Sequence, residues 1–238
     1  MSRAIQLKEE GNRHFQKGDY LGAESFYSQA IIQDPKNPAL YTNRAMARLK
    51  LSLWDSVITD CQSVLALPST ASATSLPAVT AAVLQAKKAR WEQREKRRVR
   101  EDQDLERTML RLLEAERAAD VAAAADDESE RQIVDEDARA REEQLRTVFE
   151  RSRLLGGDGR REVPDWAIDD ISFGFMVDPV VTKTGKSYER ASIMEHLRRH
   201  PCDPLTREPL AAADLRPNMA LRQACEEFLT DNGWAADW

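Results

Sequence analysis

The stretch Ile171-Ser-Phe-Gly-Phe-Met-Val-Asp-Pro-Val180 opens the segment that decides the fold of the C-terminal third of this chain. It runs into the β-prone pair Val180-Val181, then into a polar turn that contains a glycine, and the chain is β-prone again around Tyr188. Two short β-prone runs joined by such a turn predict an antiparallel hairpin. The segment therefore begins with a loop and a hairpin.

Two helices are expected after this hairpin. Apolar residues recur at helical spacing from Ile193 to Leu197. His200-Pro201 ends this helix, because a residue before proline is pushed out of the α region. After a proline-bounded loop that reaches Pro209, Asn218 can cap a last helix. The expected buried stripe of that helix comprises Leu221, Ala224, Cys225 and Phe228.

The segment contains too few ligands for a domain built around zinc. Two tetrahedral zinc sites would need about eight Cys or His ligands. Residues 163–238 offer His196, His200, Cys202 and Cys225. We therefore expect no metal and no cofactor, and an apolar core with a hydrogen-bonded polar network must hold the domain.

This order of loop, hairpin, helix, loop and helix resembles the U-box, the zinc-free relative of the RING domain of ubiquitin ligases. The resemblance implies a ligase that forms no covalent bond with ubiquitin and acts by holding a loaded conjugating enzyme beside a substrate. It also implies that Arg207 positions the ubiquitin, because a planar guanidinium can donate to two carbonyl groups at once. By the same resemblance, the residues that bind the conjugating enzyme are Ile171, Phe173, His196, Pro204 and Thr206.

Each candidate residue also has a purely structural interpretation. Ile171 and Phe173 could be core residues beside the hairpin, and His196 could be a partly exposed polar side chain. Cys225 is expected in the core and Cys202 as a loop thiol. Neither is expected to be a nucleophile, because no activating partner accompanies them in the sequence.

The N-terminal part, residues 1–68, contains two copies of a repeat with a period of about 34 residues, which is typical of tetratricopeptide repeats. Small residues at several repeat positions let paired helices approach closely. Two copies are fewer than such a stack usually needs, so another element must cover its end. The matching positions are Gly11, Ala23, Tyr27, Ala30 and Pro35 in the first copy and Ala45, Val57, Cys61, Val64 and Ser69 in the second.

Residues 69–77 form a low-complexity loop where a third repeat would be expected, and residues 78–155 predict a charged helical segment. Thin apolar stripes favour an antiparallel helical hairpin that pairs with a second copy of the chain, and a single solvated helix is the alternative. Trp91 could anchor this segment against the repeats or pack in a coiled coil. The stripes comprise Leu105, Met109, Leu112, Ala119 and Ala123, followed by Val134, Ala138, Leu145 and Val148.

The order of repeats, charged helices and a U-box over residues 163–238 is similar to that of the CHIP-like co-chaperone ubiquitin ligases, with the third repeat missing. Strings such as Leu7-Lys-Glu-Glu-Gly-Asn-Arg13, Tyr41-Thr-Asn-Arg-Ala45 and Asp231-Asn-Gly-Trp234 carry this resemblance. It implies three kinds of partner: a conjugating enzyme, the C-terminal tails of heat-shock chaperones, and misfolded client proteins.

The resemblance places the chaperone-tail groove at Lys8, Asn12, Asn43 and Lys50. Lys8 and Asn12 are four residues apart and share a helical face, which suits charge-assisted bonds to a terminal carboxylate. The clamp lysine of the third repeat has no counterpart here, so weakened binding is expected. The alternative is that the four residues are surface lysines and turn-forming asparagines.

Together these patterns predict a mainly α protein: tetratricopeptide hairpins, a long charged helical hairpin and a small α+β U-box without zinc. The predicted function is a ubiquitin-protein ligase that links a loaded conjugating enzyme to chaperone-bound clients. The alternative is a non-catalytic tetratricopeptide co-chaperone adaptor. The net charge of −6 argues against nucleic-acid binding, and no apolar run is long enough to span a membrane. Three scattered cysteines fit a reducing compartment, which is the cytoplasm or also the nucleus.

Overall fold

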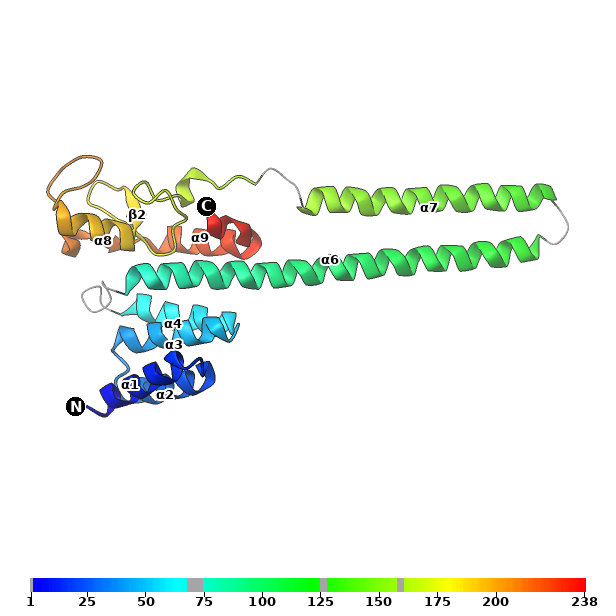
Figure 1. Cartoon of the computed structure of the whole chain (residues 1–238). Coiled ribbons are helices and arrows are strands. Elements are labelled where there is room, and N and C mark those ends of the chain that lie inside the picture. The colour runs from blue at the N-terminus through cyan, green and yellow to red at the C-terminus, as the bar shows by residue number, and fades with distance from the viewer. Residues whose placement is uncertain (1, 68–74, 125–127, 158–160) are drawn as a thin grey trace. The chain divides into compact units, whose positions relative to one another are not determined.

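The computed structural model describes residues 2–67, 75–124, 128–157 and 161–238 (Figure 1). The chain divides into two compact units, Met1–Glu92 with Val163–Trp238 and Gln93–Glu162. The expected charged segment of residues 78–155 therefore belongs to both units, and most of the expected loop at 69–77 lies outside the described residues. Within the described ranges, no helix has the length and apolar character needed to cross a membrane.

The N-terminal part consists of helical hairpins. Its helices are α1 (Arg3–Gln16), α2 (Tyr20–Gln33), α3 (Pro38–Lys50) and α4 (Trp54–Ala66), and each packs against the next. Side-chain caps define three of the starts: Ser2 accepts from Ile5 N, Asp19 from Gly22 N and Asn37 from Ala39 N. A polar cap satisfies backbone N–H groups that have no partner within the helix, so these sequence positions fix where the helices begin.

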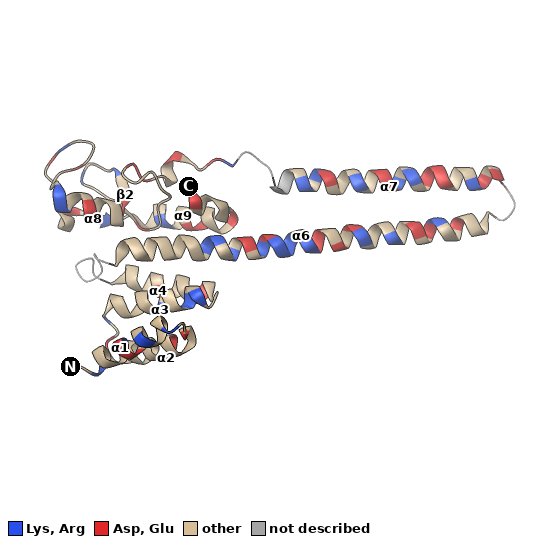
Figure 2. Ribbon diagram, viewed as in Figure 1, with Lys and Arg blue, Asp and Glu red and all other residues tan. Residues whose placement is uncertain are grey.

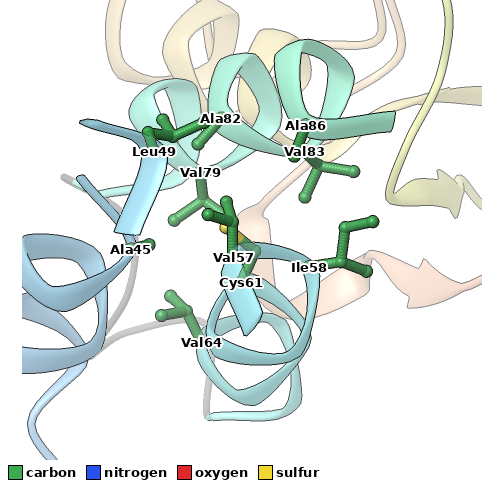
Figure 3. Packing of buried hydrophobic residues seen from close by; sticks show 10 residues of the cluster. All are labelled: Ala45, Leu49, Val57, Ile58, Cys61, Val64, Val79, Ala82, Val83 and Ala86. Atoms are coloured by element: carbon green, nitrogen blue, oxygen red, sulfur yellow. The ribbon is translucent and has the colours of Figure 1, made fainter. Parts of the chain in front are cut away.

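The repeat pattern is confirmed by burial. Gly11 and Tyr27 show why the pattern is strict, because a Cβ on Gly11 would lie 2.6 Å from Cε1 of Tyr27. In the second copy Cys61 replaces the tyrosine, and an alanine at position 45 fits beside it in the same core cluster (Figure 3). The buried repeat positions are Gly11, Ala23, Tyr27, Ala30, Ala45, Val57, Cys61 and Val64.

A buried carboxylate ties three of these helices together. Asp60 on α4 accepts from Arg44 Nη2 at 2.6 Å and from Arg48 Nη1 at 2.9 Å, both on α3. Arg48 also pairs with Glu24 on α2 at 2.8 Å. Removing one partner from such a buried cluster leaves an uncompensated charge, which costs about 3–5 kcal/mol.

Helix α6 (Leu76–Ala123) covers the end of the repeat stack. Val79 and Val83 near its start are buried in one cluster with Val57 and Cys61 of α4 (Figure 3). The prediction that another element must close a two-repeat stack is therefore confirmed. Among the described elements, α6 is the next one after α4.

The C-terminal domain is a small sheet with helices around it. Strands β1 (Pro179–Val181), β2 (Ser187–Glu189) and β3 (Arg216–Pro217) form an antiparallel sheet in the order β2-β1-β3. The predicted hairpin is confirmed, with Val180 opposite Tyr188 and Gly185 in its turn at φ +84°. The helices are α8 (Arg190–Arg199) and α9 (Met219–Asp231), with 3-10 turns at Asp165–Ala167, Ala212–Asp214 and Gly233–Asp237.

The start of α6 also contacts this domain. Trp91 Nε1 donates to the carbonyl of Asp231 at 3.0 Å, and the indole lies directly on Gly233. Lys88 pairs with Asp237 in the same region. Both expectations for Trp91, an anchor on the repeats and a coiled-coil contact, were therefore wrong, because its partners lie at the C-terminal end of the domain.

In the second unit, the rest of α6 pairs with α7 (Glu128–Gly157) as an antiparallel hairpin. Ion pairs join Arg117 to Asp135 at 2.8 Å and Arg153 to Glu106 at 2.6 Å, and positions of charged residues of both signs recur along both helices (Figure 2). The expected stripe on α6 is not the face turned to α7. Its residues Leu105, Met109, Leu112, Ala119 and Ala123 are exposed, and the partly covered apolar residues are instead Leu110, Leu113 and Val121.

Replacing Gly233 by alanine tests the contact between α6 and the C-terminal domain. A Cβ at this position would lie 2.2 Å from Cβ of Trp91, so Gly233→Ala should lower the free energy of unfolding by about 1–3 kcal/mol. Gly174→Ala is the matched control, because its Cβ would meet nothing closer than 3.6 Å. Chemical denaturation measures both, and equal stability of the two variants would contradict the packing of Trp91 on Gly233.

Candidate functional site

Two loops of the C-terminal domain are built alike, and we name them loop 1 (Asp169–Gly174) and loop 2 (Asp203–Glu208). Each begins at a buried aspartate, Asp169 at 0% and Asp203 at 1% exposure. In each, the N–H four residues later donates to the carbonyl of the aspartate, at 2.8 Å in loop 1 and 2.9 Å in loop 2. The N–H of each aspartate in turn donates to the carbonyl of the residue that ends the loop.

The aspartate side chains hold the loop interiors. Asp169 Oδ2 accepts from the backbone N of Ser172 at 2.9 Å and from its hydroxyl at 2.7 Å. Asp203 Oδ1 accepts from the backbone N of Leu205 at 2.9 Å and of Thr206 at 3.2 Å. A carboxylate that accepts several N–H bonds orders a loop much as a bound ion would. Loop shape therefore depends on two buried charges.

Both loops force one residue into a left-handed backbone conformation. Phe173 has φ +57° and Arg207 has φ +60°, each four residues after its aspartate. For residues other than glycine this conformation costs about 1–2 kcal/mol. The side chains are also exposed, Phe173 at 73%, so burial does not offset this strain. Strained and exposed residues of this kind are typical of functional surfaces.

One strand anchors both loops. The hydroxyl of Tyr188 donates to Asp203 at 3.3 Å, and the backbone N of Glu189 donates to Asp169 at 2.9 Å. The hydroxyl of Thr184, in the hairpin turn, also donates to Asp203, at 3.1 Å. Because Tyr188 and Glu189 are adjacent in β2, the strand fixes the two loops on one rigid frame.

The electrostatics of Asp203 favour its charged form. Burial raises the pKa of this carboxyl, but hydrogen bonds from the backbone of Leu205 and Thr206 and from the hydroxyl of Thr184 outweigh burial. The pKa of Asp203 therefore lies below its ordinary value. Loop 2 is consequently held by a carboxylate that stays ionised at neutral pH.

Glu189 connects this frame to helix α6. It is 4% exposed, its Oε2 accepts from the N–H groups of Val177 and Asp178 at 2.8 Å, and its Oε1 accepts from Thr80 of α6 at 3.0 Å. Burial raises the pKa of Glu189 to about 7, although the bonds from Val177 and Thr80 oppose that rise. Next to it, Asp178 pairs with Arg190 at 2.8 Å.

The site residues predicted from the sequence differ in how exposed they are and in what they contact. Ile171 is half-buried and packs against a core cluster that includes Ile193 and Leu210, so its structural interpretation holds in part. Phe173 is no core residue, given its exposure. His196 donates from Nε2 to the carbonyl of Cys202 at 3.0 Å, directly before loop 2. In loop 2, Pro204 is half-buried, and Thr206 and Arg207 are exposed.

Sequence reasoning missed three residues. Leu205 is 69% exposed on loop 2 and is, like Phe173, a large apolar side chain held toward solvent. The feature of the sequence that could have identified Leu205 is an apolar residue inside a polar, proline-bounded loop. Asp169 and Asp203 were also missed, although both stand three residues before a Ser or Thr. This repeated spacing is the sequence signal of the two matching loops.

Two observations bear on covalent and metal chemistry at the site: the burial of the cysteines and the grouping of possible metal ligands. Burial raises the pKa of the Cys225 thiol to about 12, and that of Cys61 likewise. Cys202 is half-exposed, and its backbone forms a β-bridge with Pro209. Over residues 2–67, 75–124, 128–157 and 161–238, no three Cys, His, Asp or Glu side chains are grouped so that they could hold a metal ion.

Of the four candidate residues for binding a chaperone tail, Asn12 and Asn43 are in direct contact. Oδ1 of Asn12 accepts from Tyr27 at 2.8 Å and from Nδ2 of Asn43 at 3.2 Å. These bonds orient the Asn12 amide so that its nitrogen is the group available to an anionic ligand. Lys8 is half-exposed one turn earlier on α1, and Lys50 is exposed at the end of α3.

Comparison with known proteins agrees with this architecture. Residues 163–234 match the family model of the U-box domain. The chain is 28% identical to E3 ubiquitin-protein ligase CHIP of Arabidopsis thaliana over 269 residues, which cover 98% of this chain and 95% of that protein. The C-terminal domain therefore matches the U-box, and the chain as a whole is similar to that CHIP protein over nearly its full length.

Shorter similarities concern single parts of the chain. The human small glutamine-rich tetratricopeptide repeat-containing protein beta is 44% identical over 62 residues, 26% of this chain and 20% of that protein. E3 ubiquitin-protein ligase PUB24 of Arabidopsis thaliana is 38% identical over 72 residues, 30% of this chain and 16% of that protein. The alignment with the CHIP protein is longer than this chain by about the length of one tetratricopeptide repeat, so that relative has residues that this chain lacks.

Glycine substitutions separate strain from stability at the loops. Phe173→Gly and Arg207→Gly remove exposed side chains and relieve a left-handed backbone, so each should change the free energy of unfolding by no more than about 1 kcal/mol. Ser52→Gly, at φ +59° in the repeats, is the matched control. Phe175→Ala, at a buried position, should cost about 3–5 kcal/mol. Chemical denaturation measures the free energy of unfolding of each variant. If Phe173→Gly lowers it as much as Phe175→Ala does, Phe173 is a structural residue.

Proposed function

We propose that this protein is a ubiquitin-protein ligase of the U-box type, which joins a ubiquitin-loaded conjugating enzyme to client proteins held by a chaperone. The observation that carries the proposal is the pair of rigid loops that hold Phe173 and Leu205 toward solvent. Apolar side chains fixed outward on a rigid frame lose little conformational entropy on binding, which favours docking of a protein partner. Similarity to CHIP over nearly the whole chain supports the same assignment.

In this proposal the chain contributes no covalent step. Ile171 and Pro204, both half-buried, form the base of the conjugating-enzyme surface, and the exposed Phe173 and Leu205 make contact with it. Thr206 lies at its edge, and His196 holds the start of loop 2 through its bond to Cys202. The contribution to rate is proximity and restraint of the loaded ubiquitin.

Arg207 has a separate proposed role. Its guanidinium is exposed beside the docking residues, and its backbone is fixed by the bond from its N–H to Asp203. A planar group with five N–H donors can bridge carbonyl groups of the conjugating enzyme and ubiquitin at once. We infer that Arg207 acts only once the conjugating enzyme carries ubiquitin.

The repeat groove is proposed to bind the acidic C-terminal tail of a heat-shock chaperone. Lys8 and Lys50 supply positive charge, and the Asn12–Asn43 pair offers an oriented amide donor. Helix α6 stands where a third repeat would supply a further clamp lysine. The proposed tail binding is therefore weak, and salt should screen it strongly.

We also propose that two copies of the chain pair through the charged helices. Leu105, Met109 and Leu112 are exposed on α6, and Val148 is exposed on α7. Burying an apolar stripe of this kind against its equivalent in a second copy would stabilise a homodimer.

The alternative function, a non-catalytic co-chaperone adaptor, has less support. An adaptor needs the repeat groove, but it gives no reason to keep Phe173 and Arg207 exposed in strained conformations. The U-box of such an adaptor would tolerate glycine at both positions without any loss of function.

Ubiquitin transfer tests the proposal. Phe173→Gly should lower the rate of discharge from a loaded conjugating enzyme at least tenfold, because it removes the main exposed apolar contact. Arg207→Gly should slow discharge to a similar extent yet leave the affinity for the unloaded conjugating enzyme unchanged. Ser52→Gly should keep full activity. Full discharge activity in both loop variants would contradict the ligase and favour the adaptor.

Tail binding is tested with a synthetic peptide that ends in Glu-Glu-Val-Asp with a free carboxylate. Lys8→Ala should weaken its affinity by about tenfold or more, since a charge-assisted bond is worth about 1.5–3 kcal/mol. Amidation of the peptide terminus should have the same effect, and Lys17→Ala, an exposed lysine at the end of α1, is the control. Calorimetric titration measures each, and tight binding that survives both changes would place recognition on another surface.

A further inference from the structure

A cavity of about 250 Å³ lies in the first unit, where α4, α6 and α9 meet. Its apolar wall includes Ile58 and Leu65 of α4, Val83 of α6 and Leu229 of α9. Ile58 and Val83 lie at the edge of the core cluster of the repeats (Figure 3). An apolar cavity of about 150 Å³ is enough to bind benzene, so this one has room for a larger apolar group.

The same cavity has a cationic side. Lys87 of α6 is 5% exposed, and its nearest acidic partner is Glu226 of α9, 3.5 Å from Nζ. Burial lowers the pKa of Lys87, and the attraction of Glu226 only partly restores it. An ammonium group carries three donors, and a single carboxylate at 3.5 Å engages only part of them. A second anion near Lys87 would be favourable.

Arg222 of α9 adds to this cationic side. Its terminal nitrogen pairs with the buried Asp178, while its Nε–H is buried without a hydrogen-bond partner among the described residues. Arg222 therefore lines the cavity with its charge already paired, and its buried Nε has no surface that a ligand atom could reach. Because Asp178 already pairs with Arg222, Lys87 is the lining cation that gains most from an anionic ligand.

We propose that this cavity is a binding site for a small amphipathic carboxylate, such as a medium-chain fatty acid. Its hydrocarbon body lies against Ile58, Leu65 and Leu229, and its carboxylate accepts from Nζ of Lys87. Neutral and cationic amphiphiles of the same length bind worse, because they offer this ammonium group no negative charge.

The position of the cavity gives such a ligand a defined effect. Its wall combines the last repeat helix, the capping segment of α6 and the last U-box helix. A ligand that contacts all three binds the folded first unit and not the unfolded chain, so it stabilises that unit in proportion to its occupancy. The site is independent of the docking loops and of the tail groove, and its absence would leave the proposed ligase function untouched.

Titration of the full chain with octanoate, 1-octanol and octylammonium tests the proposal, with binding followed by calorimetry and by the melting temperature. Octanoate should bind and raise the melting temperature, and 1-octanol and octylammonium should bind at least tenfold more weakly. Equal binding of octanoate and 1-octanol would overturn the proposal, as would no binding of octanoate at millimolar concentration.

Substitutions of residues that line the cavity test whether octanoate binds there. Lys87→Met should weaken octanoate binding at least tenfold while leaving 1-octanol unaffected. Leu65→Trp, which fills the cavity from its half-exposed edge, should abolish octanoate binding, and Leu21→Trp at an exposed position of α2 is the matched control. Octanoate binding that survives Leu65→Trp unchanged would show that the ligand sits elsewhere and would overturn the assignment.

Discussion

The hydrogen bonds accepted by the buried carboxylates of Asp169 and Asp203 are the interactions on which the proposed docking surface depends. Each accepts the backbone N–H groups of its loop, and each is anchored to strand β2 through Tyr188 or Glu189. In a zinc-bound relative, metal ions would impose loop geometry through their ligands. Here two negative charges in a fixed frame do so, and the strained, exposed conformations of Phe173 and Arg207 follow from that frame.

Helix α6 is the second constraint, because one helix serves both parts of the first unit. Val79 and Val83 close the repeat stack, while Thr80 donates to the buried Glu189 of the U-box. One face of this helical segment therefore closes the repeat stack, and a neighbouring face supports the strand that anchors both loops. A hydrogen-bonded path runs from Thr80 through Glu189 and Asp169 to loop 1.

Elements with a strong local period could be predicted from the sequence, and contacts between distant segments could not. The repeat positions, the hairpin and the Asn218 cap follow from spacing and capping within a few residues. The contacts of Trp91 were predicted wrongly because its partners lie about 140 positions further along the chain, and sequence periodicity does not indicate contacts between such distant residues. Likewise, heptad spacing located apolar residues on α6 but could not tell which of them face α7.

Hydrogen exchange at the amides of Leu205 and Thr206 tests the central claim most directly, by comparing the wild-type chain with Asp203→Ala. Asp214→Ala is the control, because that aspartate holds the backbone N–H of Ala211, away from loop 2. The account predicts that Asp203→Ala speeds exchange of both amides at least tenfold, equivalent to about 1.4 kcal/mol, while amides within α9 keep their protection. Unchanged protection of Leu205 and Thr206 would contradict the claim that a buried carboxylate holds the loop.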